Sequence, residues 1–244
     1  MHHADAALQA YEGEEAQVGE FGRAIALLSA SGCTAVCFAG NVPRPDFATM
    51  QADAVGRAVL PALIEAAQSG DDALLRATAK VFTDAGFMLE GAHEAAGNAS
   101  TLGVGPLGSV APAPQAVPDI ARALTVARSI GELEIGQGAV VVAGLVLAVE
   151  AQEGTDAMLA RVASLPQALR GSPEARRGVL AKAPKPIQDL RLDMPVIGPR
   201  TVEAAAAAGL AGVAGEAGGV IVLDAEKTAA AADRLGLFVV GVPR

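Results

Sequence analysis

Charged and amide side chains gather in one proline-rich stretch of an otherwise apolar chain, LAKAPKPIQDLRLDMPVIGP at residues 180–199. Each of its four prolines fixes the backbone angle φ and removes an N–H donor, so we predict a stiff loop. Asp189, Asp193 and Gln188 offer the hard oxygen ligands that Mg²⁺ prefers. The positive charges of the stretch, which suit a phosphate, are those of Lys182, Lys185 and Arg191.

Together these side chains describe a site for a phosphate-bearing substrate and its Mg²⁺. Phosphoryl transfer depends on neutralising charge and orienting a water molecule more than on covalent catalysis. The alternative is a set of solvated loop charges without a ligand, because the loop is locally charge-balanced.

A second polar segment, VEAQEGTDAML at 149–159, follows the most apolar run of the chain. Glu150 and Glu153 could hold a divalent cation or a sugar hydroxyl. We predict that Thr155 is the N-cap of the next helix, which leaves free N–H groups at the helix start. The alternative is a charged first turn that complements the helix dipole.

A third polar segment is FAGNVPRPDF at 38–47. Gly40 can let a ligand approach the backbone, and Asn41 and Arg44 could bind a phosphate or a nucleoside. An ordinary proline turn with a surface arginine is the alternative.

Several function classes are excluded by composition and by missing motifs. The net charge of −9 argues against a nucleic-acid-binding protein, which would usually have a basic face. The longest apolar run, 138–149, is too short to cross a membrane. The sequence has no phosphate loop GxxxxGK[ST], no GxGxxG after a strand, no HExxH and no GxSxG. A signal peptide is not expected, because the N-terminus lacks a basic and an apolar region.

The elements that must position these residues alternate between helices and short apolar strands. This order predicts an α/β fold with parallel strands and crossover helices. Residues 97–118 are rich in glycine, proline, serine and alanine, and they lack apolar periodicity. We therefore predict a Rossmann-like first domain with a parallel sheet at 1–100, a linker at 101–118 and a second α/β domain at 119–244.

Several long motifs, in this order, resemble the LpxI family, the UDP-2,3-diacylglucosamine pyrophosphatases of lipid A synthesis. The motifs are FAGNVPRPDF, GDDALLR, EGAHE, DIARAL, IGQGAVVVAGLVLAVEAQEGTDAML, GVLAKAPKPIQDLRLDMPVIGP and AGLAGVAGEAGGVIVLD. The resemblance implies Mg²⁺-dependent hydrolysis of UDP-2,3-diacylglucosamine to UMP and 2,3-diacylglucosamine 1-phosphate (lipid X). It also implies two α/β domains, a cytoplasmic protein and peripheral contact with the inner membrane; we expect a homodimer.

The resemblance also implies roles for individual residues. Asp193 and Asp189 are the expected catalytic and metal-binding residues, and the sequence does not separate them. The residues expected to bind the substrate are Lys182, Gln188, Arg191, Gln137, Glu150, Thr155, Asp156, Asn41 and Arg44.

One departure from the family concerns the start of the chain. Family members begin with a strand and a glycine-rich turn of the type GGGxLP, which we do not find before Gly19. We therefore expect a destabilised N-terminal half. Two alternatives to the family's function stay open. One is an impaired sugar-nucleotide or lipid-binding protein, and the other is a hydrolase of another nucleotide sugar.

Overall fold

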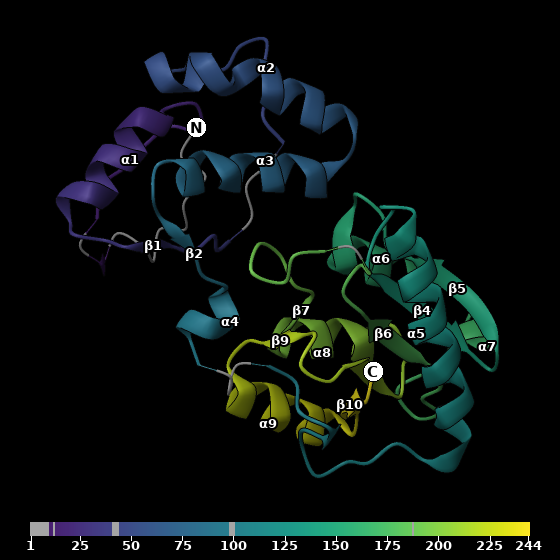
Figure 1. Cartoon of the computed structure of the whole chain (residues 1–244). Helices are drawn as coiled ribbons and strands as arrows, with labels where there is room; N and C mark the ends of the chain where they lie inside the picture. Colours follow the sequence, from purple (N-terminus) through teal and green to yellow (C-terminus); the bar gives the residue numbers. More distant parts are fainter. Residues whose placement is uncertain (1–9, 12, 41–43, 98–100, 187) are drawn as a thin grey trace. The chain divides into compact units, whose positions relative to one another are not determined.

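The computed structural model describes residues 10–11, 13–40, 44–97, 101–186 and 188–244 (Figure 1). The chain divides into two compact units, Met1–Ala95 and Ala96–Arg244. Both combine helices with strands, so the predicted α/β class is confirmed. The predicted domain boundaries stay a prediction.

The first unit packs three long helices beside a short parallel pair of strands. Its core contains the buried side chains of Phe21, Leu63, Phe82 and Phe87. Pro61 lies inside the second long helix, which continues through it. The elements are α1 (Phe21–Ala30), β1 (Ala35–Val36), α2 (Ala54–Gln68), α3 (Asp71–Asp84), β2 (Met88–Leu89) and α4 (Ala92–Ala95).

The second unit is built on a six-stranded sheet with the order β3-β10-β8-β6-β4-β5. Strands β6, β8 and β10 are parallel, whereas β3, β4 and β5 run antiparallel to their neighbours, so the sheet is mixed rather than parallel throughout. A separate parallel pair joins β7 to β9. The elements are β3 (Gly105–Pro106), η3 (Pro114–Ala116), α5 (Val117–Glu132), β4 (Gly138–Val142), β5 (Leu145–Val149), α6 (Gly154–Ala163), α7 (Gln167–Arg170), β6 (Val179–Lys182), β7 (Val196–Ile197), α8 (Pro199–Ala207), β8 (Gly212–Glu216), β9 (Ile221–Val222), α9 (Ala225–Leu235) and β10 (Phe238–Val242).

Helices cover both faces of this sheet. Successive side chains of a strand point to opposite faces, so Leu180 packs with α6, α8 and α9, whereas Val179 and Ala181 pack with α5. Both faces of the central strands are therefore buried, which explains their near-continuous apolar sequence.

The hairpin between β4 and β5 turns at Ala143 and Gly144, which have φ values of 49° and 76°. Two positive φ values identify the turn type whose twist matches the flanking strands. The buried Asp119 of α5 accepts the N–H groups of both residues at 2.8 and 2.7 Å. This helix therefore fixes the turn as well as the sheet face.

The segment predicted as a linker is ordered within the second unit. Leu102 is buried in the core, and β3 adds an antiparallel strand next to β10. This strand was not predicted from the sequence because it has only two residues. Pro106 is tolerated there because β3 is an edge strand, where proline's missing N–H breaks no hydrogen bond between strands.

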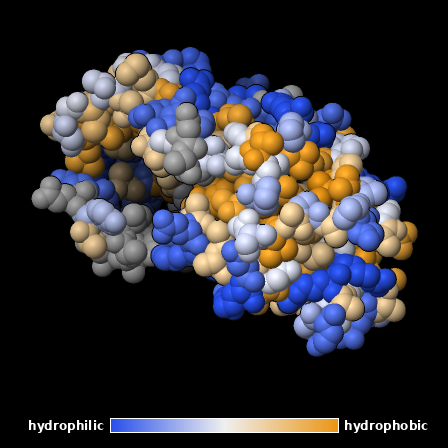
Figure 2. Space-filling view, turned by 90° about the horizontal axis from the view of Figure 1, so that it is seen from below, coloured by the Kyte–Doolittle hydropathy of each residue, from blue (hydrophilic) through white to orange (hydrophobic). Residues whose placement is uncertain are grey.

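Figure 2 shows hydrophobic residues (orange) beside hydrophilic ones (blue) on the face in view. Large apolar side chains such as Val104, Leu133 and Leu145 are exposed. Among the described residues, no helix combines the length and the apolar composition that a membrane crossing requires.

Candidate active site

Several of the predicted site residues meet at the carboxyl end of β6, the part of an open α/β sheet where ligands usually bind. Lys182 is the last residue of β6, after an apolar strand that pairs with β8. The sequence placed Lys182 in a loop, but strand pairing and burial extend the sheet to this residue. The loop runs only from 183 to 195, and Pro199 begins α8 instead of lying in it.

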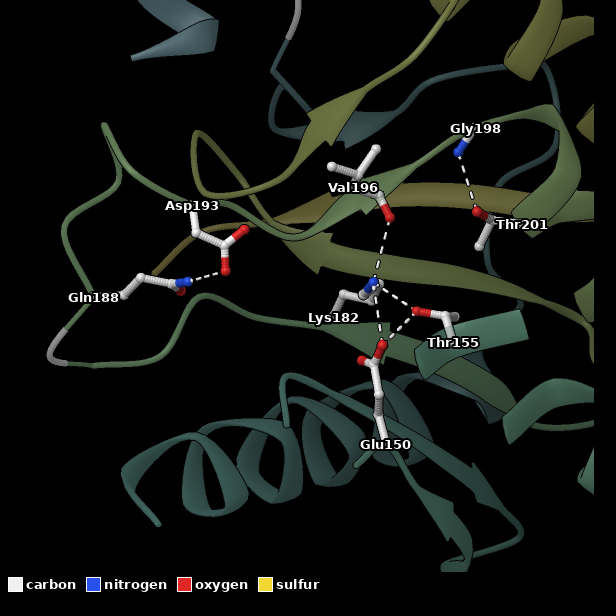
Figure 3. A network of polar contacts seen from close by, with 8 residues as sticks. All are labelled: Glu150, Thr155, Lys182, Gln188, Asp193, Val196, Gly198 and Thr201. Carbon is white, nitrogen blue, oxygen red and sulfur yellow. Dashed lines mark hydrogen bonds and ion pairs between the residues drawn. The ribbon is translucent and has the colours of Figure 1, made fainter. Parts of the chain in front are cut away.

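Lys182 is 4% exposed and is surrounded by protein acceptors (Figure 3). Its Nζ donates to Thr155 Oγ1 at 2.7 Å and to the carbonyl of Val196 at 3.4 Å. The carboxylate oxygen Oε1 of Glu150 lies 3.8 Å away and accepts the Thr155 hydroxyl at 2.6 Å. Three segments distant in the sequence are thus joined through one ammonium group.

Burial and acidic neighbours shift the pKa of Lys182 in opposite directions. Removal from water lowers its pKa from the ordinary value, and the carboxylates of Glu150, Asp193 and Asp156 oppose that shift. Because an isolated buried cation is costly, the acidic neighbours compensate part of that cost.

The pKa of Asp193 shifts in the opposite direction from that of Lys182. Burial raises the pKa of its carboxyl, and the positive charges of Lys185 and Lys182 and the amide of Gln188 oppose the increase. Gln188 Nε2 donates to Asp193 Oδ2 at 2.5 Å, and Gln188 Oε1 accepts the backbone N–H of Lys185. The loop thus holds one carboxylate partly away from water beside two lysines.

Asp189 has a different environment from Asp193. Its carboxylate accepts the backbone N–H of Arg191 and two guanidinium N–H groups of the same residue, at 2.7–3.0 Å. The Asp189 charge is therefore balanced by a neighbouring arginine that the sequence assigned to the substrate.

The second polar segment separates into two parts. Glu150 turns towards Lys182, whereas Glu153 pairs with Arg161 at 2.6 Å, so the two acids do not share a cation. Thr155 is not the N-cap: α6 begins at Gly154 with Glu153 as its N-cap, and the Thr155 hydroxyl bonds Glu150 instead.

The other predicted residues lie further from Lys182 or in the first unit. Asp156 is largely exposed and pairs with Arg200 at 2.9 Å. The backbone carbonyl of Gln137 accepts the backbone N–H of Ala183, the first residue of the loop. The side-chain Oε1 of Gln137 is buried and has no hydrogen-bond partner among the described residues. Arg44, in the first unit, donates to the carbonyl of Ala67 and lies 3.5 Å from Asp71, and Asn41 lies outside the described residues.

One acidic residue at the same end of the sheet, Glu216, was not among the site residues predicted from the sequence. Glu216 ends β8, is 2% exposed, and bonds the guanidinium of Arg128 from α5. Arg244 lies 3.7 Å away from the same carboxylate. The signal was present, because Glu216 ends the apolar run GVAGE as Lys182 ends VLAK.

The site fits Mg²⁺ only in a form with few protein ligands. Among the described residues, no three His, Cys, Asp or Glu side chains gather in a way that could hold a metal ion. Mg²⁺ in phosphate-processing sites often uses one or two carboxylates together with waters and substrate oxygens. Asp193 suits that role, because a bound cation would offset the burial of its charge.

The fold and this site define a two-unit α/β protein with a carboxylate–lysine site at the end of a mixed sheet. Comparison with known families extends this description over nearly the whole chain. Residues 1–99 match the LpxI N-terminal domain, and residues 103–240 match the LpxI C-terminal domain. The chain is also 60% identical over 239 residues to the UDP-2,3-diacylglucosamine pyrophosphatase LpxI of Caulobacter vibrioides. The aligned region covers 98% of this chain and 85% of that protein. The chain belongs to the LpxI family.

Proposed function

We propose that this protein hydrolyses the pyrophosphate bond of UDP-2,3-diacylglucosamine and so acts in lipid A biosynthesis. The observation that carries the proposal is the 60% identity to a pyrophosphatase of that name along nearly the whole chain. The products are UMP and 2,3-diacylglucosamine 1-phosphate (lipid X): water adds to one phosphorus, and the bridging P–O bond breaks.

The chain supplies the charges that such a reaction requires. Asp193 would hold Mg²⁺, which would neutralise charge on the diphosphate. Of the two candidate aspartates we favour Asp193, since Asp189 is already paired with Arg191. Lys185 adds positive charge close to Asp193. These preset charges lower the reorganisation needed as negative charge develops on the phosphate.

The test is UMP release from UDP-2,3-diacylglucosamine with Mg²⁺ and with EDTA. We expect release with Mg²⁺ and none with EDTA. Asp193→Asn should reduce the rate by at least about 100-fold, the lower range for a missing acid–base or metal-binding group. Asp189→Asn should reduce it less, and Asp84→Asn, an exposed control on α3 of the first unit, should not change it. Equal rates in wild type and Asp193→Asn would contradict the assignment.

The substrate also implies contact with a membrane surface. We propose a cytoplasmic protein that meets its lipid at the inner membrane without crossing it. Leu133 and Ile135, which follow the end of α5, are exposed apolar side chains that could contact an apolar surface. Flotation with vesicles that contain the substrate should recover the protein with the lipid, and absence from the lipid fraction would argue against this. We also propose a homodimer, and light scattering that finds a monomer would contradict it.

A further inference from the structure

One row of residues crosses the sheet of the second unit at the level of Lys182. In strand order, Gly138 of β4 is in register with Lys182, Lys182 with Gly215 of β8, and Gly215 with Gly241 of β10. Glu150, just after β5, donates its backbone N–H to Gly138 at 2.8 Å and so extends the row. Glu150 and Lys182 are therefore two strands apart, and a glycine separates them.

Gly138 lets these two side chains meet. Neighbouring strands lie about 4.8 Å apart, so two residues on either side of β4 are separated by roughly twice that distance at the backbone. Their charged atoms nevertheless approach to 3.8 Å. A Cβ atom at position 138 would lie 2.6 Å from Glu150 Oε2, which is too close for any real contact. A larger residue at 138 would therefore push the carboxylate away from Lys182.

The next glycine of the row serves a different purpose. A Cβ atom at position 215 would meet Val220 Cγ2 at 2.8 Å and Leu102 Cδ2 at 3.0 Å, which are core side chains. Gly215 therefore lets apolar groups pack on the sheet, whereas Gly138 leaves space for the Glu150 carboxylate. The two glycines flank Lys182 on opposite sides and provide a matched pair.

Lys182 has little capacity left for a ligand. An ammonium group has three N–H donors. Thr155 Oγ1, the Val196 carbonyl and the Glu150 carboxylate surround it, and 4% of the residue is exposed. Val196 is the first residue of β7, immediately after the 183–195 loop that contains Asp193. The Lys182–Val196 bond therefore joins the two ends of this loop (Figure 3).

We propose that Gly138 and Glu150 are positioning residues that hold the Lys182 ammonium where it fastens the ends of the Asp193 loop. Lys182 is then a clamp within the protein and not a ligand of the substrate's phosphates. This inference rests on the proposed pyrophosphatase function and deepens it, since the clamp acts on the chemical step through Asp193.

The test compares Gly138→Ala and Glu150→Gln with Gly215→Ala. The first disturbs the fit of Glu150, the second removes its charge with little change in shape, and the third adds the same methyl group on the other side of Lys182. Two properties are measured: the NMR signal of the Lys182 side-chain ammonium, and kcat and KM for UMP release. With four lysines in the chain, a ¹⁵N-lysine spectrum is simple, and Lys182→Arg assigns the signal.

For Gly138→Ala and Glu150→Gln we expect a lost or strongly broadened Lys182 signal. We also expect kcat to fall by about 10- to 100-fold, the range for residues that support a functional group, with KM within about twofold. Gly215→Ala should lower the melting temperature but keep the Lys182 signal and kcat. A KM that rises tenfold with unchanged kcat would make Lys182 a substrate ligand and overturn the clamp. Equal losses of kcat in both glycine variants would leave only a packing role and overturn it too.

Failure of the proposed function gives a different result. A wild-type protein that releases no UMP under any metal condition contradicts the pyrophosphatase proposal. The clamp is still decided by the ammonium signal: persistence of a sharp signal in both Gly138→Ala and Glu150→Gln overturns it.

Discussion

Lys182 and Asp193 are both partly or fully removed from water, and burial disfavours the charged form of each. It lowers the pKa of Lys182 and raises that of Asp193. Each residue's charge opposes the shift of the other. This arrangement costs folding free energy, which is common where ionisable groups serve a site rather than stability.

Asp193→Asn should stabilise the fold while it removes activity. Because the folded-state pKa of Asp193 is above its ordinary value of 3.8, the ionised form destabilises the protein above that folded pKa. This cost disappears as the pH falls through the folded pKa towards 3.8. We expect Asp193→Asn to raise the free energy of unfolding at pH 7–8 by about 1 kcal/mol or less, within the range of single substitutions.

Urea unfolding at several pH values checks this expectation. The difference between Asp193→Asn and wild type should shrink as the pH falls towards 4. Asp189→Asn is the comparison, because an exposed aspartate–arginine pair contributes only about 0–1 kcal/mol. A lower stability of Asp193→Asn at neutral pH would show that the attraction of the two lysines exceeds the cost of burial.

The pair of Lys182 and Glu150 should show strong coupling in stability. Lys182→Met leaves the Glu150 carboxylate buried without its cation, which typically costs about 3–5 kcal/mol. Adding Glu150→Gln to Lys182→Met removes that buried charge, so the double variant should be more stable than Lys182→Met alone. A double-mutant cycle of chemical unfolding measures the coupling. Additive effects would indicate that the two groups do not interact.

At the scale of elements, α5 organises the site end of the sheet. It covers one face of β4 and β6, and its first turn fixes the β4–β5 hairpin through Asp119. Near its end, Gly131 packs against Lys185 and Pro186: a Cβ atom at 131 would lie 3.2 Å from the Lys185 Cα atom. The same helix therefore contacts both the hairpin and the start of the Asp193 loop.

Asp119→Ala should destabilise the protein through this hairpin. The N–H groups of Ala143 and Gly144 would lose their shared acceptor, and losing a buried acceptor costs about 1–3 kcal/mol for each unsatisfied donor that water does not reach. Asp84→Ala, which removes an exposed ion pair with Lys80 on α3, should cost no more than about 0.5 kcal/mol. Thermal and urea unfolding compare the two variants. A similar small cost for both would mean that water replaces Asp119.

At the scale of the whole molecule, the two units differ in how they are stabilised. The second unit has apolar clusters on both faces of a six-stranded sheet. The first unit has a small core around Phe21, Leu63, Phe82 and Phe87, and its described sheet is a pair of two-residue strands. Because stability follows buried apolar area, we expect the first unit to open more readily.

Hydrogen exchange checks this difference between the units. Amides of α1, α2 and α3 should exchange before those of β4, β6 and β8. Phe82→Ala should speed exchange in the first unit, since removing a buried phenylalanine costs about 3–5 kcal/mol, and leave β6 and β8 protected. Equal loss of protection in both units would show that they unfold together.

The sequence by itself determined the kinds of elements and pointed to candidate residues of a site. Alternating helical and apolar segments predicted α/β structure, because local periodicity reflects burial on one face or both. The charges in 180–199 pointed to the loop that holds Asp193, because charged side chains clustered on a stiff loop of an otherwise apolar chain suggest a binding site. The resemblance of long motifs to the LpxI family was confirmed by both domain matches.

Only the tertiary structure decided how those residues meet. Strand pairing made Lys182 the last residue of β6 and brought Glu150 within reach of it across Gly138. It also made Gly105–Pro106 an edge strand of the sheet, although the composition around it resembles that of a linker. Register and packing join residues far apart in the chain, and no local pattern encodes a distance of that kind. For this reason the sequence pointed to Lys182, Glu150 and Asp193 together, and only the fold separated the buried Lys182–Glu150 pair from the partly buried Asp193 carboxylate.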